Sequence, residues 1–118
     1  MTNTKDLTHL TCVPCRGDEP KLTAAQIEEY KPQIPDWEVL EKDDVPRLRR
    51  TFKFKDFAGA LTFTQQVGEA AEEQGHHPVI RTEWGKVTVD WWTHKIKGLH
   101  QNDFIMAAKS DKLYSNLG

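Results

Sequence analysis

The segment that most constrains the fold is residues 80–91, where side chains that favour strands, most of them apolar, recur at every second position on both sides of one glycine. Such alternation places every second side chain on one face of a strand, and Gly85 supplies the tight turn between two strands. The alternating positions are Ile80, Thr82, Trp84, Val87, Val89 and Trp91. Because strands joined by so short a turn pair antiparallel, this segment predicts a β-hairpin.

A second hairpin is predicted earlier in the chain, from strands at Trp37–Leu40 and Pro46–Phe54 that turn at residues 42–44. Together the hairpins predict an α+β fold with a single four-stranded antiparallel sheet and helices packed on one face. The expected element order is helix-strand-strand-helix-strand-strand-helix. This arrangement leaves the other sheet face or a sheet edge open to a ligand or a partner subunit.

Three helices are predicted from their local stop and start signals. Thr23 with Gln26 forms a capping box before the first helix, which prolines at positions 32 and 35 end near Tyr30 or Lys31. A long helix starts after Asp56 and ends at about Gln74. Its apolar spacing selects Phe57, Ala60, Leu61, Thr64, Val67 and Ala71 for one side. Gly75 is placed to end it in the left-handed conformation, and a last helix covers Gln101–Tyr114.

Length and composition indicate one small domain. The chain has 118 residues, and we expect residues 1–20 to be a flexible N-terminal arm and residues 21–118 to be the domain. Only 37% of the residues are hydrophobic, which favours a homodimer or homotetramer because a polar small domain completes its burial by association. A formal charge of −2 argues against nucleic acid as a partner. Without an apolar membrane span or signal peptide, the cytoplasm is the expected location.

Two local features favour structural interpretations over functional ones. The basic stretch at Arg47, Arg49 and Arg50 alternates as the solvated side of a strand does, which is favoured over a phosphate-binding patch. Cys12 and Cys15 have the spacing of half a zinc site or of a redox dithiol. A second pair and the strand-helix context are both absent, so two free thiols in the arm are favoured.

The histidines are the chemically informative residues. His76 and His77 stand at a corner between Gly75 and Pro78, where side chains are presented at the end of a sheet. His94 ends the strand that returns to this corner. Since no His-x-His or His-x-x-x-His pair is present to chelate one ion, acid–base chemistry is favoured over a metal site.

Two further side chains near the histidines are open to more than one interpretation. Asp103 either favours the dipole of the last helix or orients an imidazole. Of the adjacent tryptophans, Trp91 is expected in the core, and the environment of Trp92 is left open.

The spacing of these residues resembles the signature of the pterin-4a-carbinolamine dehydratases. The matching pattern is Glu72, three residues, His76-His77-Pro78, five residues, Trp84, nine residues, His94, eight residues and Asp103. The resemblance covers the chain from about Leu22 to Tyr114, and the element order agrees with the family. Shorter matching stretches are Phe54-Lys55-Asp56-Phe57, Lys86-Val87, Thr93-His94 and Gly98-Leu99.

The resemblance implies removal of water from 4a-hydroxytetrahydropterin, which gives quinonoid dihydropterin, without a metal or cofactor. By that likeness His76, His77 and His94 are catalytic, and Glu72 and Asp103 support them. The implied substrate-binding residues are His76, His77, Pro78, Thr93 and His94. The family likeness also implies tetrahydrobiopterin recycling with a functional link to an aromatic amino acid hydroxylase. The alternative is a non-catalytic binding or coactivator-like accessory protein of the same fold.

Overall fold

The computed structural model describes residues 7–12 and 20–117 of the chain. Within these residues, one antiparallel sheet is formed by β1 (Glu38–Lys42), β2 (Val45–Lys53), β3 (Val79–Glu83) and β4 (Lys86–Trp91). The strands lie in the order β1-β2-β4-β3, so both hairpins are present and β2 pairs with β4 between them. The sheet is therefore the one that the alternating segments predict.

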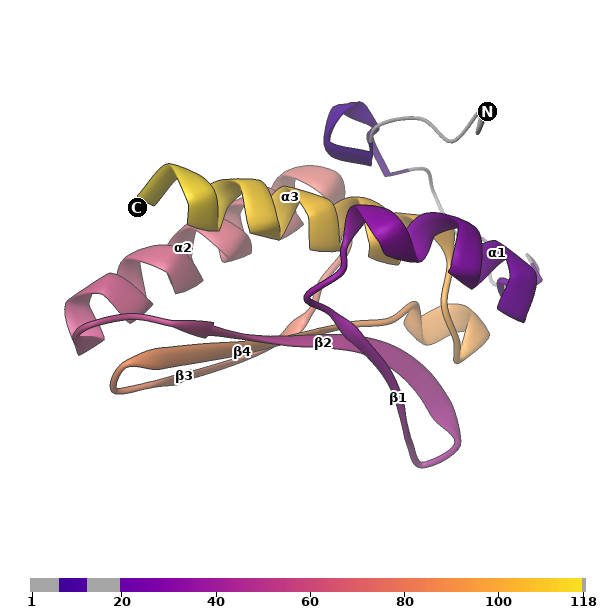
Figure 1. The fold of residues 1–118 in the computed structure, drawn as a ribbon, viewed down its shortest axis with the longest axis horizontal. Helices are drawn as coiled ribbons and strands as arrows, with labels where there is room; N and C mark the ends of the chain where they lie inside the picture. The colour runs from indigo at the N-terminus through magenta and orange to yellow at the C-terminus, as the bar shows by residue number, and fades with distance from the viewer. Residues whose placement is uncertain (1–6, 13–19, 118) are drawn as a thin grey trace.

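The helices of the described residues are α1 (Ala24–Tyr30), α2 (Phe57–Gln74) and α3 (Gln101–Leu117). Short 3-10 turns are η1 (Leu7–His9), η2 (Lys31–Gln33) and η3 (His94–Ile96). Figure 1 shows all three α-helices on the same side of the sheet. The predicted α+β class, the element order and the packing on one face are all confirmed.

Local signals determine where these elements begin and end. The Thr23 hydroxyl accepts a hydrogen bond from the Gln26 backbone, and the Gln26 side chain accepts one from the Thr23 backbone. Asp56 caps α2 by accepting from the amide of Gly59, and Gly75 ends α2 at φ 65°. Asp43 and its neighbour at position 44 both have positive φ, which matches the twist of a two-residue hairpin turn.

The buried face of α2 differs in part from the predicted one. Its buried residues are Ala60, Phe63, Val67 and Ala71. Phe57 and Leu61 are instead 41% and 49% exposed. For Leu61 the reason is geometric, because each residue turns the helix by about 100°, so Leu61 lies well to the side of the stripe that includes Ala60 and Val67.

Part of the predicted N-terminal arm belongs to the core. Leu7 has no exposed surface, and its amide donates to the side-chain oxygen of Gln33 at 2.9 Å. The amide of Cys12 donates to the side-chain oxygen of Gln74 at 2.8 Å. Leu7 thus fills apolar space beside α3, and the division into a flexible arm of residues 1–20 and a domain of residues 21–118 stays a prediction.

Two arginines of the basic stretch are not on a solvated surface. Arg47 is only 8% exposed, and its guanidinium donates to Asp90 at 3.2 Å. Arg50 lies on the helix-covered face and pairs with Asp111 at 2.7 Å. The alternation of residues along a strand identifies the sheet face on which a side chain lies. The residue that pairs with this side chain belongs to another strand or helix, which the alternation does not identify.

The pKa values of the two carboxyl groups are shifted in opposite directions, although the arginines lower both. Burial by itself raises the pKa of Asp90, but hydrogen bonds from Arg49 and Arg47 outweigh it and leave the pKa below its ordinary value. For Asp111, burial outweighs the hydrogen bonds from Trp37 and Arg50, and its pKa is raised. In the described residues, no helix is long and apolar enough to cross a bilayer.

Candidate active site

The corner between α2 and β3 places two histidines at the end of the sheet. After Gly75 the backbone amide of His76 donates to the carbonyl of Ala71 at 3.1 Å, which closes the end of the helix. Pro78 then leads directly into β3. His76 and His77 are therefore held on a short, hydrogen-bonded connection rather than on a long loop.

Asp103 joins three segments of the chain. Its carboxylate is fully buried, and one oxygen, Oδ2, accepts from the Thr93 hydroxyl at 2.8 Å and from the His100 amide at 2.9 Å. The other oxygen, Oδ1, lies 2.6 Å from Nε2 of His76. Because carboxylate oxygens accept hydrogen bonds, Nε2 of His76 is the donor of the third hydrogen bond.

His76 is also supported on its ring face. Its imidazole stacks on the indole of Trp91, with ring centroids 5.7 Å apart and planes 12° from parallel. Trp91 has no exposed surface, which confirms its predicted place in the core. Carboxylate and indole together restrict both the tautomer and the orientation of His76, and they leave Nδ1 without a protein hydrogen bond in the described residues.

His77 has a different environment from His76. Its Nε2 lies 2.5 Å from Oε2 of Glu72, and the two side chains are 61% and 77% exposed. Glu72 is on the last turn of α2, so the pair bridges the helix end and the corner. This pair is in solvent, where an ion pair contributes little to stability but still orients the ring.

His94 is the first residue of η3 and is exposed. Its ring stacks on Trp92 at a centroid distance of 4.5 Å. The preceding residue, Thr93, binds the same carboxylate as His76, so the backbone of His94 lies close to that pair. Among the described residues, no hydrogen bond joins the three imidazoles to one another.

The ring contacts that support two of the histidines were not predicted from the sequence. Trp91 and Trp92 each support a histidine ring, and Arg47 lies over the Trp92 indole. The alternation of strand residues does predict that the two tryptophans face opposite sides of the sheet, but not which ring each one meets. His100 precedes α3, and its Nδ1 accepts from the amide of Asn102 at 3.0 Å.

Cys12 lies near this end of the molecule, half-buried, with its Sγ 3.9 Å from the carbonyl oxygen of Asn102. Burial, and after it the negative charge of Asp103, raises the pKa of the Cys12 thiol to about 11. Such a thiol is protonated at neutral pH and is a poor nucleophile, as the structural interpretation expects. Cys15 lies outside the described residues.

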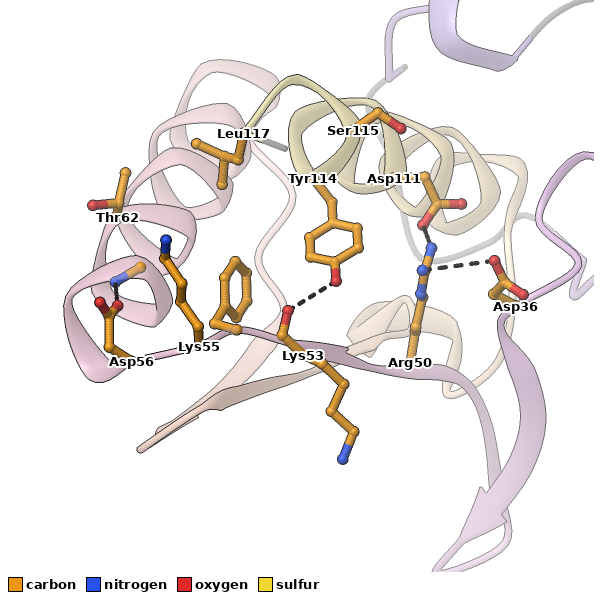
Figure 2. Close-up of a pocket in the computed structure, with 12 residues that line it drawn as sticks. Asp36, Arg50, Lys53, Lys55, Asp56, Thr62, Asp111, Tyr114, Ser115 and Leu117 are labelled. Carbon is orange, nitrogen blue, oxygen red and sulfur yellow. Dashed lines mark hydrogen bonds and ion pairs between the residues drawn. The ribbon is translucent and has the colours of Figure 1, made fainter.

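A separate pocket of about 880 Å³ lies at the other ends of α2 and α3 (Figure 2). Its charged lining residues are Asp36, Arg50, Lys53, Lys55, Asp56 and Asp111. Arg50 is already paired with two of the carboxylates, and the Lys53 side chain points away from the helices. Acidic and basic groups balance here, so the pocket shows no charge preference and none of the predicted site residues.

In the described parts of the chain, no three His, Cys, Asp or Glu side chains lie together as ligands for a metal ion. The arrangement at Asp103 is a hydrogen-bonded carboxylate–imidazole pair, and His77 and His94 follow His76 and Thr93 directly in the sequence. Fold and site thus define a small α+β protein with a histidine–carboxylate centre suited to moving protons.

Comparison with known proteins identifies the family. The model of the family described as "Pterin 4 alpha carbinolamine dehydratase" matches residues 20–113. A protein of Nitrosococcus oceani named "Putative pterin-4-alpha-carbinolamine dehydratase" is 58% identical over 109 residues, which cover 92% of this chain and 96% of that protein. A similarly named protein of Gloeobacter violaceus is 52% identical over 96% of this chain and 97% of its own length. The chain belongs to the pterin 4 alpha carbinolamine dehydratase family, and its class of enzyme is a lyase.

Solved structures agree with this assignment. The crystal structure of a "transcriptional coactivator/pterin dehydratase" from Brucella melitensis has a TM-score of 0.72 and 31% sequence identity, and the match covers 80% of this chain and 98% of that one. A pterin dehydratase-like protein described as a RuBisCO assembly factor of the alpha-carboxysome has a TM-score of 0.57 over 67% of this chain and 89% of that one. At 24% identity it shows the fold alone.

Proposed function

We propose that the protein removes water from 4a-hydroxytetrahydropterin to give quinonoid dihydropterin, through acid–base catalysis by its histidines. The observation that carries this proposal is the hydrogen bond between His76 and the fully buried Asp103. In this reaction the hydroxyl on carbon 4a gains a proton as its bond to carbon breaks. Nitrogen 5 loses its proton, and the electron pair that remains forms the new double bond.

His76 suits one of these proton transfers. Because Nε2 donates to Asp103, the neutral imidazole presents the lone pair of Nδ1 as a base. The carboxylate stabilises the positive charge that appears when Nδ1 takes a proton. The stack on Trp91 keeps the ring in one plane, so Nδ1 points in a defined direction.

His94 is proposed as the second proton-transfer group, and either histidine serves as the acid. Its exposed ring has no hydrogen-bonded protein partner among the described residues, so both nitrogens are available to a ligand. His77 is proposed to hold the pterin ring, with Pro78 and Thr93 lining the site and Glu72 orienting His77. We infer that the reaction needs no metal or cofactor.

Steady-state kinetics on synthetic 4a-hydroxytetrahydropterin tests these roles. His76→Ala and His94→Ala should each lose roughly 10²–10⁴-fold in turnover, and the double variant should have almost no rate above background. His77→Ala should raise KM more than it lowers kcat. His9→Ala, in η1, is the matched control and should keep full activity. A double variant with a folded circular dichroism spectrum and near-wild-type turnover would refute the proposal.

We further propose that the protein works in the cytoplasm, in tetrahydrobiopterin recycling beside an aromatic amino acid hydroxylase. The alternative is a binding or coactivator-like accessory role, and the Brucella protein is titled both coactivator and dehydratase. A purely accessory role predicts that wild type and the double variant dehydrate the substrate equally slowly. The same kinetic comparison therefore separates the two candidate functions.

A further inference from the structure

We propose that Trp92 is the positioning residue of His94, held in place by Arg47 and Asp90. The inference rests on the proposed function, since it concerns how one of the proposed proton-transfer groups is oriented. It assigns a role to three residues that the family signature in this sequence does not include.

The direct contact is between two rings. The imidazole of His94 lies 4.5 Å from the indole of Trp92, centroid to centroid, with planes 27° apart. His94 is exposed at the start of a three-residue 3-10 turn, where no hydrogen bond to a described residue restrains its ring. The half-buried Trp92 is therefore the protein group that selects its orientation.

Trp92 is itself restrained from the neighbouring strand. The guanidinium carbon of Arg47 lies 3.8 Å from the indole centroid, a cation–π distance. Arg47 is nine-tenths buried at its side chain and donates to Asp90 at 3.2 Å. Asp90 also receives two hydrogen bonds from Arg49, at 2.7 and 2.8 Å, and its own side chain is 5% exposed. A chain of contacts thus runs from a buried ion pair, through Arg47 and Trp92, to the exposed imidazole.

The size of the effect follows from the rotamers that the contact removes. A free histidine has three staggered χ1 wells and about two χ2 orientations, which makes roughly six states. If only one of them directs a ring nitrogen at the substrate, loss of the stack lowers the productive fraction several-fold. We therefore expect Trp92→Ala to reduce kcat roughly 3- to 10-fold with little change in KM, which is less than removal of His94 itself.

The competing role for Trp92 is as a stacking surface for the planar substrate. That role predicts a different result, because loss of a ring that binds substrate raises KM and leaves kcat unchanged. It also predicts that the loss is the same whether or not His94 is present. The two roles are therefore separable by kinetics alone.

The experiment is a double-mutant cycle on the full chain with Trp92→Ala, His94→Ala and the combined variant. Positioning predicts that Trp92→Ala has no further effect on kcat in the His94→Ala background, because its action passes through that imidazole. Trp92→Phe, which keeps a ring, should restore most of the activity. Trp84→Ala is the matched control, since that indole is 71% exposed at the β3–β4 turn.

A structural readout accompanies the kinetics. The ring protons of His94 should carry an indole ring-current shift in the NMR spectrum, lost in Trp92→Ala and kept in Trp84→Ala. Additive losses in the cycle, or a loss confined to KM, overturn the positioning role while the proposed function stands. Full activity of His94→Ala alone overturns the proposed role of His94, and the positioning role with it.

Discussion

Replacement of Asp103 by asparagine tests the central pair at the site. The amide keeps the shape of the carboxylate, so its oxygen can still accept from Thr93 and from the His100 amide. Its nitrogen then faces Nε2 of His76, where the carboxylate oxygen lay at 2.6 Å. Because that nitrogen is a donor, neutral His76 must present an unprotonated Nε2 and carry its proton on Nδ1. The imidazole then has the wrong tautomer for a base at Nδ1.

The expected loss in turnover is about 10²–10⁴-fold, the usual contribution of a positioned acid or base, and the same change in a Ser-His-Asp triad costs about 10⁴-fold. Stability should fall by about 2 kcal/mol, since charge-assisted hydrogen bonds become neutral ones. The assay is steady-state dehydration together with urea unfolding.

Glu72→Gln is the matched control for this substitution. It removes a carboxylate from the other histidine pair, but both side chains there are largely exposed. The expected loss in turnover is less than about 10-fold, because exposed pairs orient weakly and contribute little to stability. Turnover of folded Asp103→Asn within about threefold of the wild-type value would show that the His76 tautomer is not what the reaction depends on.

Four further predictions address the metal, the assembly, the thiol and the buried ion pair. Activity should survive exhaustive dialysis against a chelator, and a loss restored by zinc or iron would contradict acid–base catalysis. β1 and β3 are edge strands, so we expect a dimer in which two sheets pair edge to edge. Further pairing through the long helices would give a tetramer. A monomer mass of 13.6 kDa in light scattering at micromolar concentration would contradict this prediction. Burial raises the pKa of Cys12 from 9.0 to about 11, which lowers the thiolate fraction at pH 8. In a Cys15→Ser variant, Cys12 should therefore be alkylated at pH 8 roughly 100-fold more slowly in the native than in the unfolded state. Equal alkylation rates would refute the burial of this thiol. Since the pKa of Asp90 is lowered in the folded state, its stabilisation is present above the unfolded pKa of about 3.9 and is lost as the pH falls through the folded value. Asp90→Asn should therefore cost about 3 kcal/mol in urea unfolding at pH 7 and progressively less as the pH falls below about 3.9, and an unchanged difference would contradict the linkage.

The sequence alone was sufficient for features that close within a few residues. Thr23 and Gln26 are three positions apart, so their capping box forms wherever the rest of the chain lies. Asp56 begins the long helix and Gly75 ends it for the same local reason. The strict alternation before and after Gly85 likewise determined a hairpin, because strand pairing across a two-residue turn needs no distant partner.

The candidate site could be predicted from the sequence only in part. Spacing and family resemblance select His76, His77 and His94 as candidates, but the hydrogen bond of His76 to Asp103 spans 27 residues and depends on where α3 is docked. The pairing of β2 with β4 likewise brings Arg47 and Arg49 to Asp90, about 40 residues away.

The tertiary structure therefore decided which rings and charges meet. A sequence pattern reports the face on which a side chain lies, because that depends on the local backbone repeat. Its partner depends on strand order and helix docking, which arise from burial of the whole core. For this reason the histidines and the hairpins were predictable, whereas the contacts of Trp92 with Arg47 and His94 were not.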